Sequence, residues 1–581
     1  MTSLTTIDCL LCRCHGEIDG VMDFDRLQRQ LADDCQVGSV QVRDALCLGD
    51  ALTQIAQRMR ADDGKRLLIA GCSALARGDD LLARLESEGI DPTRVMVTDI
   101  REGCAWIHAD RPDEATIKAA SLIRMGIAAL HHREASPEVD IEVCPHVLVI
   151  GGGPAGMAAA AAIGRAGVPV ALVEATGKLG GMLNTLSRVA PGDRGPEEIL
   201  EPLATAIQEN PDIQVHLRTK VARIEGSTGN FKALLTGKNG DTPLTTGAVI
   251  VATGAKPLLP RDAYRYGQLA GVISGMEMEK GFKDGRMVSG KTVFIQCVGV
   301  RNPDRSYCSA VCCPAALKNA IRLKTADPLN AVTILNRDIM SPGRQLEALY
   351  RQATAMGVEF YRFAPDDPPR IEGQDRVTGV RVADVLSGRE RWIEADRIVL
   401  STPFEPRENP VIPFPADRHG FYRVQPFLHT VETTAPGLFV CGTARWPVLI
   451  DGALAQGRAA AIKALHLASR PTRKASRLIG FQRSRMGCAR IAQETCTGCG
   501  NCVTACPFDA CRLEKTENGL RAAVDPVRCM GCGSCTTVCP NQSAVIPEMT
   551  PITIARVVES AFAESRVPRL CLGTEGSIAN P

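Results

Sequence analysis

Two runs of four cysteines near the C-terminal end constrain this chain of 581 residues more than any other feature. Both have the spacing C-x2-C-x2-C-x3-C-P. This is the spacing of bacterial two-cluster ferredoxins, in which the fourth cysteine of each run binds the other cluster. The sequence therefore predicts two [4Fe–4S] clusters. Their ligand sets are Cys496, Cys499, Cys502 and Cys539 for one, and Cys529, Cys532, Cys535 and Cys506 for the other. Zinc is the alternative metal, because paired CxxC motifs also bind zinc.

The cysteine count also indicates the class of protein. The chain has 24 Cys, and thiols in a reducing compartment are more often metal ligands or redox groups than disulfides. Residues 1–11 lack the basic start and long apolar run of a signal peptide, and no stretch is apolar for the roughly 18 residues of a membrane span. We therefore expect a cytoplasmic, multi-domain metalloprotein without a membrane span.

Charge and aromatic content exclude one class of partner. Lys and Arg number 67 and Asp and Glu 65, which leaves a net charge of +2, and aromatic residues make up 4%. Nucleic-acid binding needs a basic surface and often aromatic stacking platforms. We expect neither nucleic acid nor an anionic membrane as a partner.

A glycine loop predicts a dinucleotide site. Residues 151–156 read GGGPAG, directly after the apolar run 147–150 and before an Ala-rich helix at 157–167. Glycines at these positions allow the tight turn, the approach of backbone amides to a pyrophosphate and close helix packing. Glu174 ends the next strand, where a carboxylate can accept from a ribose hydroxyl. The candidate residues are Gly151, Gly153, Pro154, Ala155, Gly156 and Glu174.

Three further segments favour FAD over NAD. They are 178–182 (KLGGM), 249–254 (VIVATG) and 437–442 (GLFVCG), and they resemble segments of two-dinucleotide-binding flavoproteins. Their spacing is similar to that of a thioredoxin-reductase-like fold, with residues of about 290–400 inserted between two halves of the FAD domain. The added candidate residues are Lys178, Gly181, Met182, Thr253, Gly254 and Gly442.

The inserted segment differs from a nicotinamide domain. Its first turn reads QCVGVR at 296–301, without the GxGxxG pattern, so a pyrophosphate could not approach the backbone. We expect that neither NADH nor NADPH binds there. The same region holds four cysteines, for which metal ligation is favoured over a structural role. They are Cys297, Cys308, Cys312 and Cys313.

The N-terminal segment has its own α/β pattern, with strands at 66–70 and 95–98 and helices at 81–88 and 114–130. Cys72 directly follows the first of these strands, and Cys104 comes shortly after the second. Both then project from the carboxyl edge of one sheet, where sites are common. The spacing leaves open whether these cysteines are ligands or buried core residues.

Several motifs resemble the A subunit of heterodisulfide reductase. They are 101–108 (REGCAWIH), 296–299 (QCVG) and 307–313 (YCSAVCC), and with the FAD and ferredoxin segments they follow the family's order. The resemblance implies an iron–sulfur flavoprotein within a larger complex, with one or two clusters beyond the ferredoxin pair. It makes Cys14, Cys47, Cys72 and Cys104 candidate ligands of an N-terminal cluster, and assigns Cys297, Cys308, Cys312 and Cys313 to an atypical site near the flavin. Local differences from the family pattern are His15 after Cys14, and Ala74-Leu75-Ala76 after Ser73.

The predicted function is that of an oxidoreductase whose FAD takes up two electrons and passes single electrons to the clusters. The resemblance implies partners: other heterodisulfide-reductase-like subunits, and ferredoxin or a hydrogenase- or dehydrogenase-derived electron input. It also implies a homo-oligomer within that complex, and electron bifurcation or confurcation. One alternative is a non-catalytic electron carrier or scaffold. Another is a stand-alone flavin disulfide reductase, which would need a CxxC near the flavin, whereas Cys9/Cys12 is the one such pair outside the ferredoxin runs. No catalytic residue is predicted.

The expected fold class is α/β, a thioredoxin-reductase-like two-dinucleotide-binding flavoprotein domain with an N-terminal α/β domain and a C-terminal two-cluster ferredoxin domain. The expected domains are 1–140 (N-terminal α/β), 145–289 (first half of the FAD domain), 290–402 (degenerate nucleotide-binding insert), 403–469 (second half of the FAD domain), 470–490 (basic linker), 491–548 (ferredoxin) and 549–581 (tail).

Overall fold

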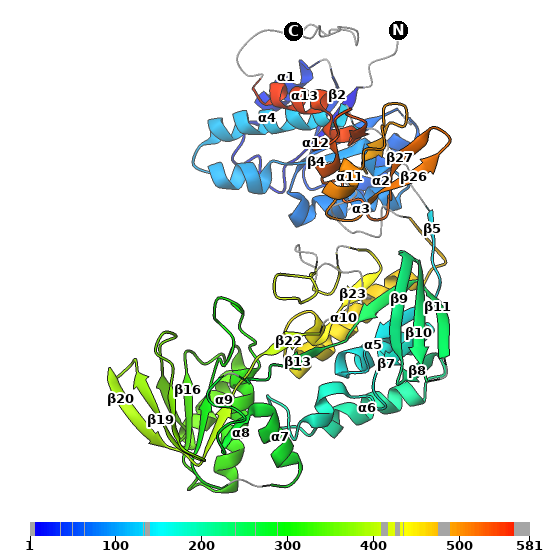
Figure 1. Ribbon diagram of the computed structural model, residues 1–581. Helices are drawn as coiled ribbons and strands as arrows, with labels where there is room; N and C mark the ends of the chain where they lie inside the picture. Colours follow the sequence, from blue (N-terminus) through cyan, green and yellow to red (C-terminus); the bar gives the residue numbers. More distant parts are fainter. Residues whose placement is uncertain are drawn as a thin grey trace. The chain divides into compact units, whose positions relative to one another are not determined.

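The computed structural model describes residues 6–562 except 35, 49, 63, 132, 134–139, 239, 262, 287–288, 408–415, 425–429, 434 and 475–487. The chain divides into two compact units (Figure 1). One consists of Met1–Val139 with Lys474–Pro581, and the other of Asp140–Arg473. Most of the predicted basic linker lies outside the described residues. Within the described ranges, no helix has the length and apolar character to cross a lipid bilayer.

The N-terminal domain is a parallel sheet with helices on both faces. Its strands have the order β2-β1-β3-β4, which are Val37–Arg43, Ile7–Cys12, Arg66–Gly71 and Val95–Asp99. Helices α1 (Phe24–Ala32) and α4 (Pro112–His131) share a buried core with one face. Helices α2 (Ala51–Arg60) and α3 (Asp79–Ser87) share a core with the other. The strands and helices expected in this segment are confirmed to within two residues, and β1, β2, α1 and α2 were not expected.

The second unit begins with a five-stranded parallel sheet of order β23-β12-β6-β7-β8. These strands are Leu438–Val440, Ala248–Val251, Val147–Ile150, Val170–Glu174 and Ile213–Leu217. Every residue of β6, β7 and β12 is buried, as expected for parallel strands covered on both faces. Helices α5 (Pro154–Arg165) and α10 (Ile450–Ala468) pack against the sheet, and α6 (Pro196–Gln208) packs against α5.

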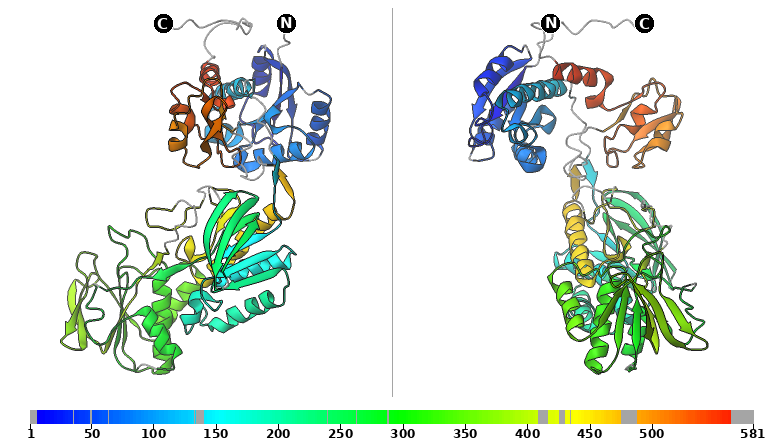
Figure 2. Two further views of the ribbon diagram at one scale, coloured as in Figure 1. Left: turned by 45° about the vertical axis from the view of Figure 1, so that its right-hand side comes forward. Right: turned by 90° about the vertical axis from the view of Figure 1, so that its left-hand side faces the viewer.

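An antiparallel sheet covers the face opposite α5 and α10, and shares a core with β6, β7 and β12 (Figure 2). Its strands are β9 (Lys220–Ser227), β10 (Asn230–Gly237) and β11 (Gly240–Thr246). The apolar patterns of the sequence predicted strands β6 and β12 and helix α10 closely, whereas the antiparallel strands β9–β11 were not expected.

The inserted domain begins before residue 290, the boundary expected from the sequence, and forms a second parallel sheet of order β14-β21-β15-β16-β17. Its strands are Val272–Ser274, Arg397–Leu400, Thr292–Ile295, Val332–Asn336 and Glu359–Arg362. Helices α7 (Gly275–Lys283), α8 (Cys312–Ala326) and α9 (Arg344–Ala355) share a core with one face. Strands β18–β20 (Arg370–Gly373, Val377–Asp384 and Arg389–Glu394) contribute to the core on the other face. The short strands β13 (Ala255–Pro257) and β22 (Phe404–Pro406) pair where the chain enters and leaves this domain.

The ferredoxin segment consists of short elements around its cysteines. They are β25 (Arg490–Ile491), α11 (Asn501–Ala505), β26 (Cys511–Thr516), β27 (Gly519–Val524), α12 (Ser534–Thr537) and β28 (Ala544–Val545). Strands β26 and β27 form a hairpin, and β25 pairs with β28. The following segment, expected as a tail, contains helix α13 (Pro551–Ala561), which packs against α4 (Figure 1).

Candidate functional site

The glycine loop between β6 and α5 has the geometry that the sequence predicted. Gly151 has a φ of +110°, and a Cβ atom on it would lie 2.3 Å from the Ala252 carbonyl oxygen. A Cβ atom on Gly156 would lie 1.9 Å from the Gly151 carbonyl oxygen. Such distances exclude any side chain, so both glycines are required for the turn and for close packing of the helix. A Cβ atom on Gly153 would meet no atom within 4 Å, so this glycine leaves space for a ligand.

The Glu174 carboxylate at the end of β7 binds backbone amides of the glycine loop and of the segment after β7. One of its carboxylate oxygens accepts from the Gly152 amide at 2.8 Å, and the other accepts from the Thr176 amide at 2.7 Å. The Thr176 hydroxyl also donates to this second oxygen, at 2.8 Å. Because a carboxylate has about four lone-pair sites, the site that is left for a ligand hydroxyl is on the oxygen that binds the Gly152 amide. The carboxylate therefore both fixes the loop and remains available to a ribose.

A cavity of about 960 Å³ extends from this loop into the inserted domain. Ten of the twelve predicted FAD residues line it, namely Gly151, Gly153, Pro154, Ala155, Glu174, Gly181, Met182, Thr253, Gly254 and Gly442. The other two do not: Gly156 packs against the turn, and Lys178 is exposed on the loop after β7. Residues 448–450, at the start of α10, complete this region of the lining, where a helix N-terminus favours negative charge.

Two polar groups in this cavity have no partner in the described part of the chain, and they indicate whether a large polar ligand fits. Thr253 Oγ1 and Asn319 Oδ1 are buried, and neither has a hydrogen-bond partner within the described residues of the chain. Both residues line the cavity. Buried polar atoms are normally paired, so these atoms fit a ligand with polar groups at both places. The glycine loop, the remaining acceptor site of Glu174 and these two atoms fit FAD.

A buried ion pair lines the same cavity and was not found from the sequence. The Lys318 ammonium on α8 contacts the Glu279 carboxylate on α7, and both side chains are 4% exposed. Burial raises the pKa of Glu279, but Lys318 and hydrogen bonds from Ser187 outweigh it, so the pKa lies below its usual value. Burial lowers the pKa of Lys318, and Glu279 opposes this change. The two residues are 39 positions apart on different helices, so no local pattern connects them.

The central cysteines come together at the end of β15 and the start of α8. Cys297 follows β15 with a φ of +61°, and Cys312 and Cys313 are the first residues of α8. Burial raises the pKa of Cys313 to about 12, and the nearby Cys297 and Cys308 thiols act in the same direction. Cys312 also lines the flavin cavity. The structure therefore places the four predicted thiols as neighbours beside that cavity.

The loop that carries these thiols is strained and basic. Cys297, Arg301 and Ala310 all have φ between +53° and +61°, which is unfavourable for residues other than glycine and typical of functional sites. Arg301 lies 3.9 Å from Cys297 Sγ through Nη1, and its Nη2 donates to Asp338 at 2.8 Å. Metal ligation requires thiolates, and this guanidinium would offset some of their charge.

The ferredoxin segment brings the first predicted ligand set together. Cys496, Cys499, Cys502 and Cys539 line one small cavity, although Cys539 belongs to the second run. Amides also point at these sulfurs: Ala522 N donates to Cys496 Sγ at 3.4 Å and Ser543 N to Cys539 Sγ at 3.2 Å. The structure thus brings the four members of this predicted set together, one of them from the other run; their ligation of a cluster stays a prediction.

The second ferredoxin set shows similar features. Cys529 and Cys535 are buried in one core, and Cys506 packs against it. The Cys529 sulfur accepts from Ala489 N at 3.4 Å and the Cys506 sulfur from Ala510 N at 3.3 Å. Cys532, the remaining member, is exposed.

Two cysteines outside the runs, Cys488 and Cys511, also lie in this region. A hydrogen bond with Cys511 lowers the pKa of Cys535 to about 7, and the Cys488 thiol donates to the Pro526 carbonyl oxygen at 3.6 Å. Sequence reasoning assigned these two no role. Cys511 is buried and Cys488 half-buried, and the spacing of the motif gives no signal for their place beside the predicted ligand cysteines.

Of the N-terminal candidates, Cys14, Cys47 and Cys72 lie around Cys12, whereas Cys104 lies in a separate core. Burial raises the pKa of Cys12, and the nearby Cys14 and Cys47 thiols raise it further. Burial likewise raises the pKa of Cys72 to about 12, with Cys14 and Cys12 adding to the effect and Arg101 opposing it. Cys104 is buried in the core shared with α1 and α4, where its thiol donates to the Ala115 carbonyl oxygen at 3.2 Å.

Among the described residues, no group of three or more His, Cys, Asp or Glu side chains is arranged to hold a single metal ion. The ligands of a [4Fe–4S] cluster bind four different irons and are therefore spaced more widely than ligands around one ion.

Two segments match known protein families. Residues 145–289 match the pyridine nucleotide-disulphide oxidoreductases, and residues 482–543 match the 4Fe-4S dicluster domain. T. acidophilum thioredoxin reductase covers 56% of this chain and its own chain fully, with a TM-score of 0.41 and 19% identity. The two family matches, together with the sheets described above, confirm the predicted fold class.

Relatives cover most of the chain. The A subunit of the Ferredoxin/F(420)H(2)-dependent CoB-CoM heterodisulfide reductase of Methanosarcina acetivorans is 28% identical over 87% of this chain and 75% of its own length. The iron-sulfur A subunit of the CoB-CoM heterodisulfide reductase of Methanocaldococcus jannaschii is 27% identical over 90% of this chain and 93% of its own. The chain is thus similar to the A subunit of heterodisulfide reductase over most of its length, and it is an oxidoreductase that combines a flavin domain with a 4Fe–4S ferredoxin domain.

Proposed function

We propose that this chain is the flavin-containing electron-transfer subunit of a heterodisulfide-reductase-like complex. The observation that carries the proposal is the position of Cys312. This residue belongs to the central group of four thiols and also lines the cavity of the glycine loop. A flavin and an iron–sulfur site would therefore share one cavity wall, which suits transfer of electrons between them.

The residues around the cavity have distinct roles in holding FAD. The loop of Gly151 and Gly153 and the start of α5 would bind the pyrophosphate, and Glu174 a ribose hydroxyl. The Thr253 hydroxyl would donate to or accept from a polar group of the ligand, and the Asn319 side-chain oxygen would accept from one. Bound FAD supplies a group that exchanges electron pairs and single electrons.

The cysteines would hold three or four clusters. The two crossed ferredoxin sets are those predicted above. The central thiols Cys297, Cys308, Cys312 and Cys313 would bind an atypical cluster near the flavin. The N-terminal cysteines would bind a further one. Support comes from the grouping of thiols at each place and from the amides that donate to sulfur in the ferredoxin segment.

The names of the relatives suggest partners. The Methanosarcina relative is named as ferredoxin- or F(420)H(2)-dependent and as one subunit of a heterodisulfide reductase. By analogy, this chain would act with other heterodisulfide-reductase-like subunits in the cytoplasm, as a homo-oligomer within the complex. Ferredoxin or a hydrogenase- or dehydrogenase-derived subunit would supply or accept electrons. Electron bifurcation or confurcation at the flavin belongs to the same proposal.

The inserted domain leads to a prediction about nicotinamide. The turn after β15 is occupied by Cys297 and by the side chain of Arg301, which folds back towards the cysteine sulfur. NADH or NADPH added to the anaerobic holoprotein should leave the flavin spectrum unchanged, because the turn offers no glycine-lined approach for a pyrophosphate. Dithionite should bleach the flavin and cluster absorption of the same sample. Rapid bleaching by either nucleotide would show that this domain, or another site, accepts hydride.

A further inference from the structure

Two N-terminal cysteines lie side by side where neighbouring strands end. Cys12 is the last residue of β1, and Cys72 follows Gly71, the last residue of β3. The two strands are parallel neighbours, so both cysteines are at the same edge of the sheet. A Cβ atom on Gly71 would lie 3.3 Å from the Cys12 Cβ atom. The absence of a side chain at Gly71 therefore keeps space open next to Cys12.

Two further cysteines reach the same edge from the loops that follow β1 and β2. The Cys14 amide donates to the Asp44 carbonyl oxygen at 2.7 Å, and the Cys12 thiol donates to the same oxygen at 3.4 Å. Cys14 and Cys47 both pack against the core that contains Cys12. Four thiols thus surround one end of β1.

Cys104 differs from these four. It follows β4 within a helical turn at Arg101–Ala105 and is fully buried against α4. Its thiol already donates to a backbone carbonyl oxygen at the start of that helix. The turn that buries Cys104 instead directs the side chain of Arg101 towards the four thiols.

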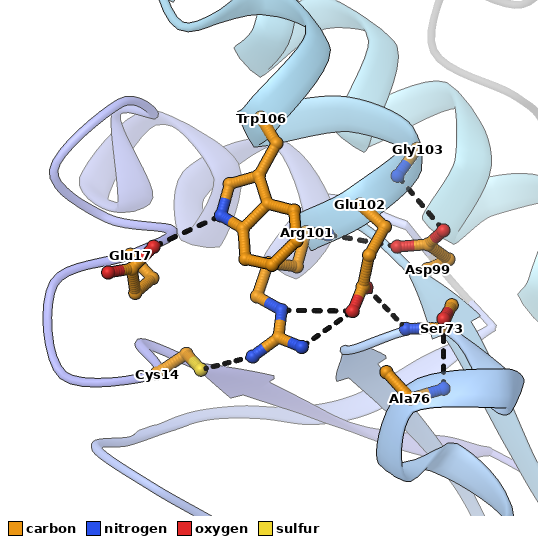
Figure 3. Close-up of polar contacts among 9 residues, drawn as sticks. All are labelled: Cys14, Glu17, Ser73, Ala76, Asp99, Arg101, Glu102, Gly103 and Trp106. Carbon is orange, nitrogen blue, oxygen red and sulfur yellow. Dashed lines mark hydrogen bonds and ion pairs between the residues drawn. The ribbon is translucent and has the colours of Figure 1, made fainter. Parts of the chain in front are cut away.

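Arg101 is held against this group by a neighbouring carboxylate (Figure 3). Its Nη1 donates to Cys14 Sγ at 3.1 Å. Glu102 Oε1 accepts from Arg101 Nε at 3.2 Å and from Nη2 at 2.5 Å. The other Glu102 oxygen accepts from the Ser73 amide at 2.7 Å, so this carboxylate also fixes the loop directly after Cys72.

An aromatic ring holds the guanidinium from another side. The Arg101 guanidinium lies 4.7 Å from the centre of the Trp106 ring, and the indole N–H donates to Glu17 at 3.1 Å. The Asp99 carboxylate accepts from the amides of Arg101 and Gly103 at 3.1 and 3.0 Å, which fixes the turn itself. A side chain restrained in this way loses little freedom when it compensates a nearby charge.

We propose that Cys12, Cys14, Cys47 and Cys72 hold the N-terminal cluster, without Cys104, and that Arg101 is a positioning residue that favours the reduced state of this cluster. The inference rests on the proposed function, because it takes the N-terminal cysteines to bind a [4Fe–4S] cluster. Reduction adds one electron to a group that already carries four thiolates, and no bond forms or breaks. A positive charge fixed beside one thiolate stabilises the form with the additional negative charge.

Iron counting tests the ligand set. In the anaerobically purified full chain, Cys12→Ser should lose about four irons per chain and Cys104→Ser should lose none, since one [4Fe–4S] cluster holds four irons. The two cysteines are both buried, so each is a matched control for the other; Cys12→Ala and Cys104→Ala repeat the comparison with a small apolar residue. Loss of iron from the Cys104 variants alone would overturn the ligand set. If Cys12→Ser, Cys14→Ser, Cys47→Ser and Cys104→Ser all keep their full iron content, the proposed N-terminal cluster itself fails.

A redox titration tests Arg101. The EPR signal that is absent in Cys14→Ser identifies the N-terminal cluster. Arg101→Gln should keep this signal but lower the equilibrium constant for its one-electron reduction about tenfold, a shift of about 59 mV to lower potential. Arg101→Lys retains a positive charge and should restore most of the shift, which a purely structural role would not predict. An unchanged potential in Arg101→Gln, with all iron present, would overturn the role of Arg101 while leaving the cluster in place.

Discussion

Replacing Cys539 with serine should remove about four of the irons that the chain carries, one whole [4Fe–4S] cluster. The reason is that Cys539 lies in the same cavity as Cys496, Cys499 and Cys502, so its loss leaves that cluster with three thiolates. FAD content should not change, because the flavin cavity belongs to the other compact unit of the chain. Iron, acid-labile sulfide and flavin per chain measure the effect.

The EPR spectrum of the same variant distinguishes crossed from uncrossed ligands. Crossed ligation predicts that Cys539→Ser loses the same signal as Cys499→Ser. Uncrossed ligation predicts that it loses the same signal as Cys532→Ser, since Cys532 and Cys539 belong to one run. Cys144→Ser is the control, because this half-buried thiol donates to the Thr245 carbonyl oxygen and lies in the flavin-binding unit. Full iron content in Cys539→Ser would contradict the predicted ligand sets.

Replacing Lys318 with methionine should lower the free energy of unfolding of the unit Asp140–Arg473 by about 3–5 kcal/mol, the usual cost of breaking a buried ion pair. Lys318 is almost fully buried and also donates to the Arg188 carbonyl oxygen at 2.9 Å. Its loss leaves the Glu279 carboxylate buried, with only the Ser187 amide and hydroxyl as donors at 3.0 and 2.8 Å among the described residues. Denaturant unfolding of the full chain, followed by flavin release, measures the change.

Two variants give this prediction its controls. Arg351→Met breaks an exposed pair with Glu347 on α9 and should cost less than about 1 kcal/mol. The double variant Lys318→Met with Glu279→Leu replaces the buried pair by apolar side chains and should recover most of the loss. If Lys318→Met unfolds at the same denaturant concentration as Arg351→Met, the pair does not stabilise the lining of the cavity.

Features that depend on local sequence were predictable. The continuous apolar runs of β6 and β12 identify buried parallel strands, and the glycine loop between β6 and α5 has the conformation that its glycines require. The predicted ferredoxin ligands belong to two short motifs, and the spacing of these motifs alone predicts that Cys539 lies with the first three cysteines of the other run, as it does in the cavity.

Features that depend on distant segments were not predictable. The edge strand β2 (Val37–Arg43) is only partly buried and has no clear alternation of apolar residues. Because β1 was not expected either, the position of Cys12 at the end of a strand was not seen. Cys104 was expected at the sheet edge, but the turn at Arg101–Ala105 directs it into the core beside α4. The Lys318–Glu279 pair depends on two helices from different regions of the insert, which no periodicity connects.

The central claim is that one polypeptide carries both FAD and iron–sulfur clusters. Quantitation of flavin, iron and acid-labile sulfide in the anaerobically purified chain tests it most directly. We predict about one FAD per chain, with about eight irons from the ferredoxin pair and about twelve or more once the central or N-terminal site is filled. A colourless preparation, with neither flavin absorbance nor acid-labile sulfide, would contradict this claim.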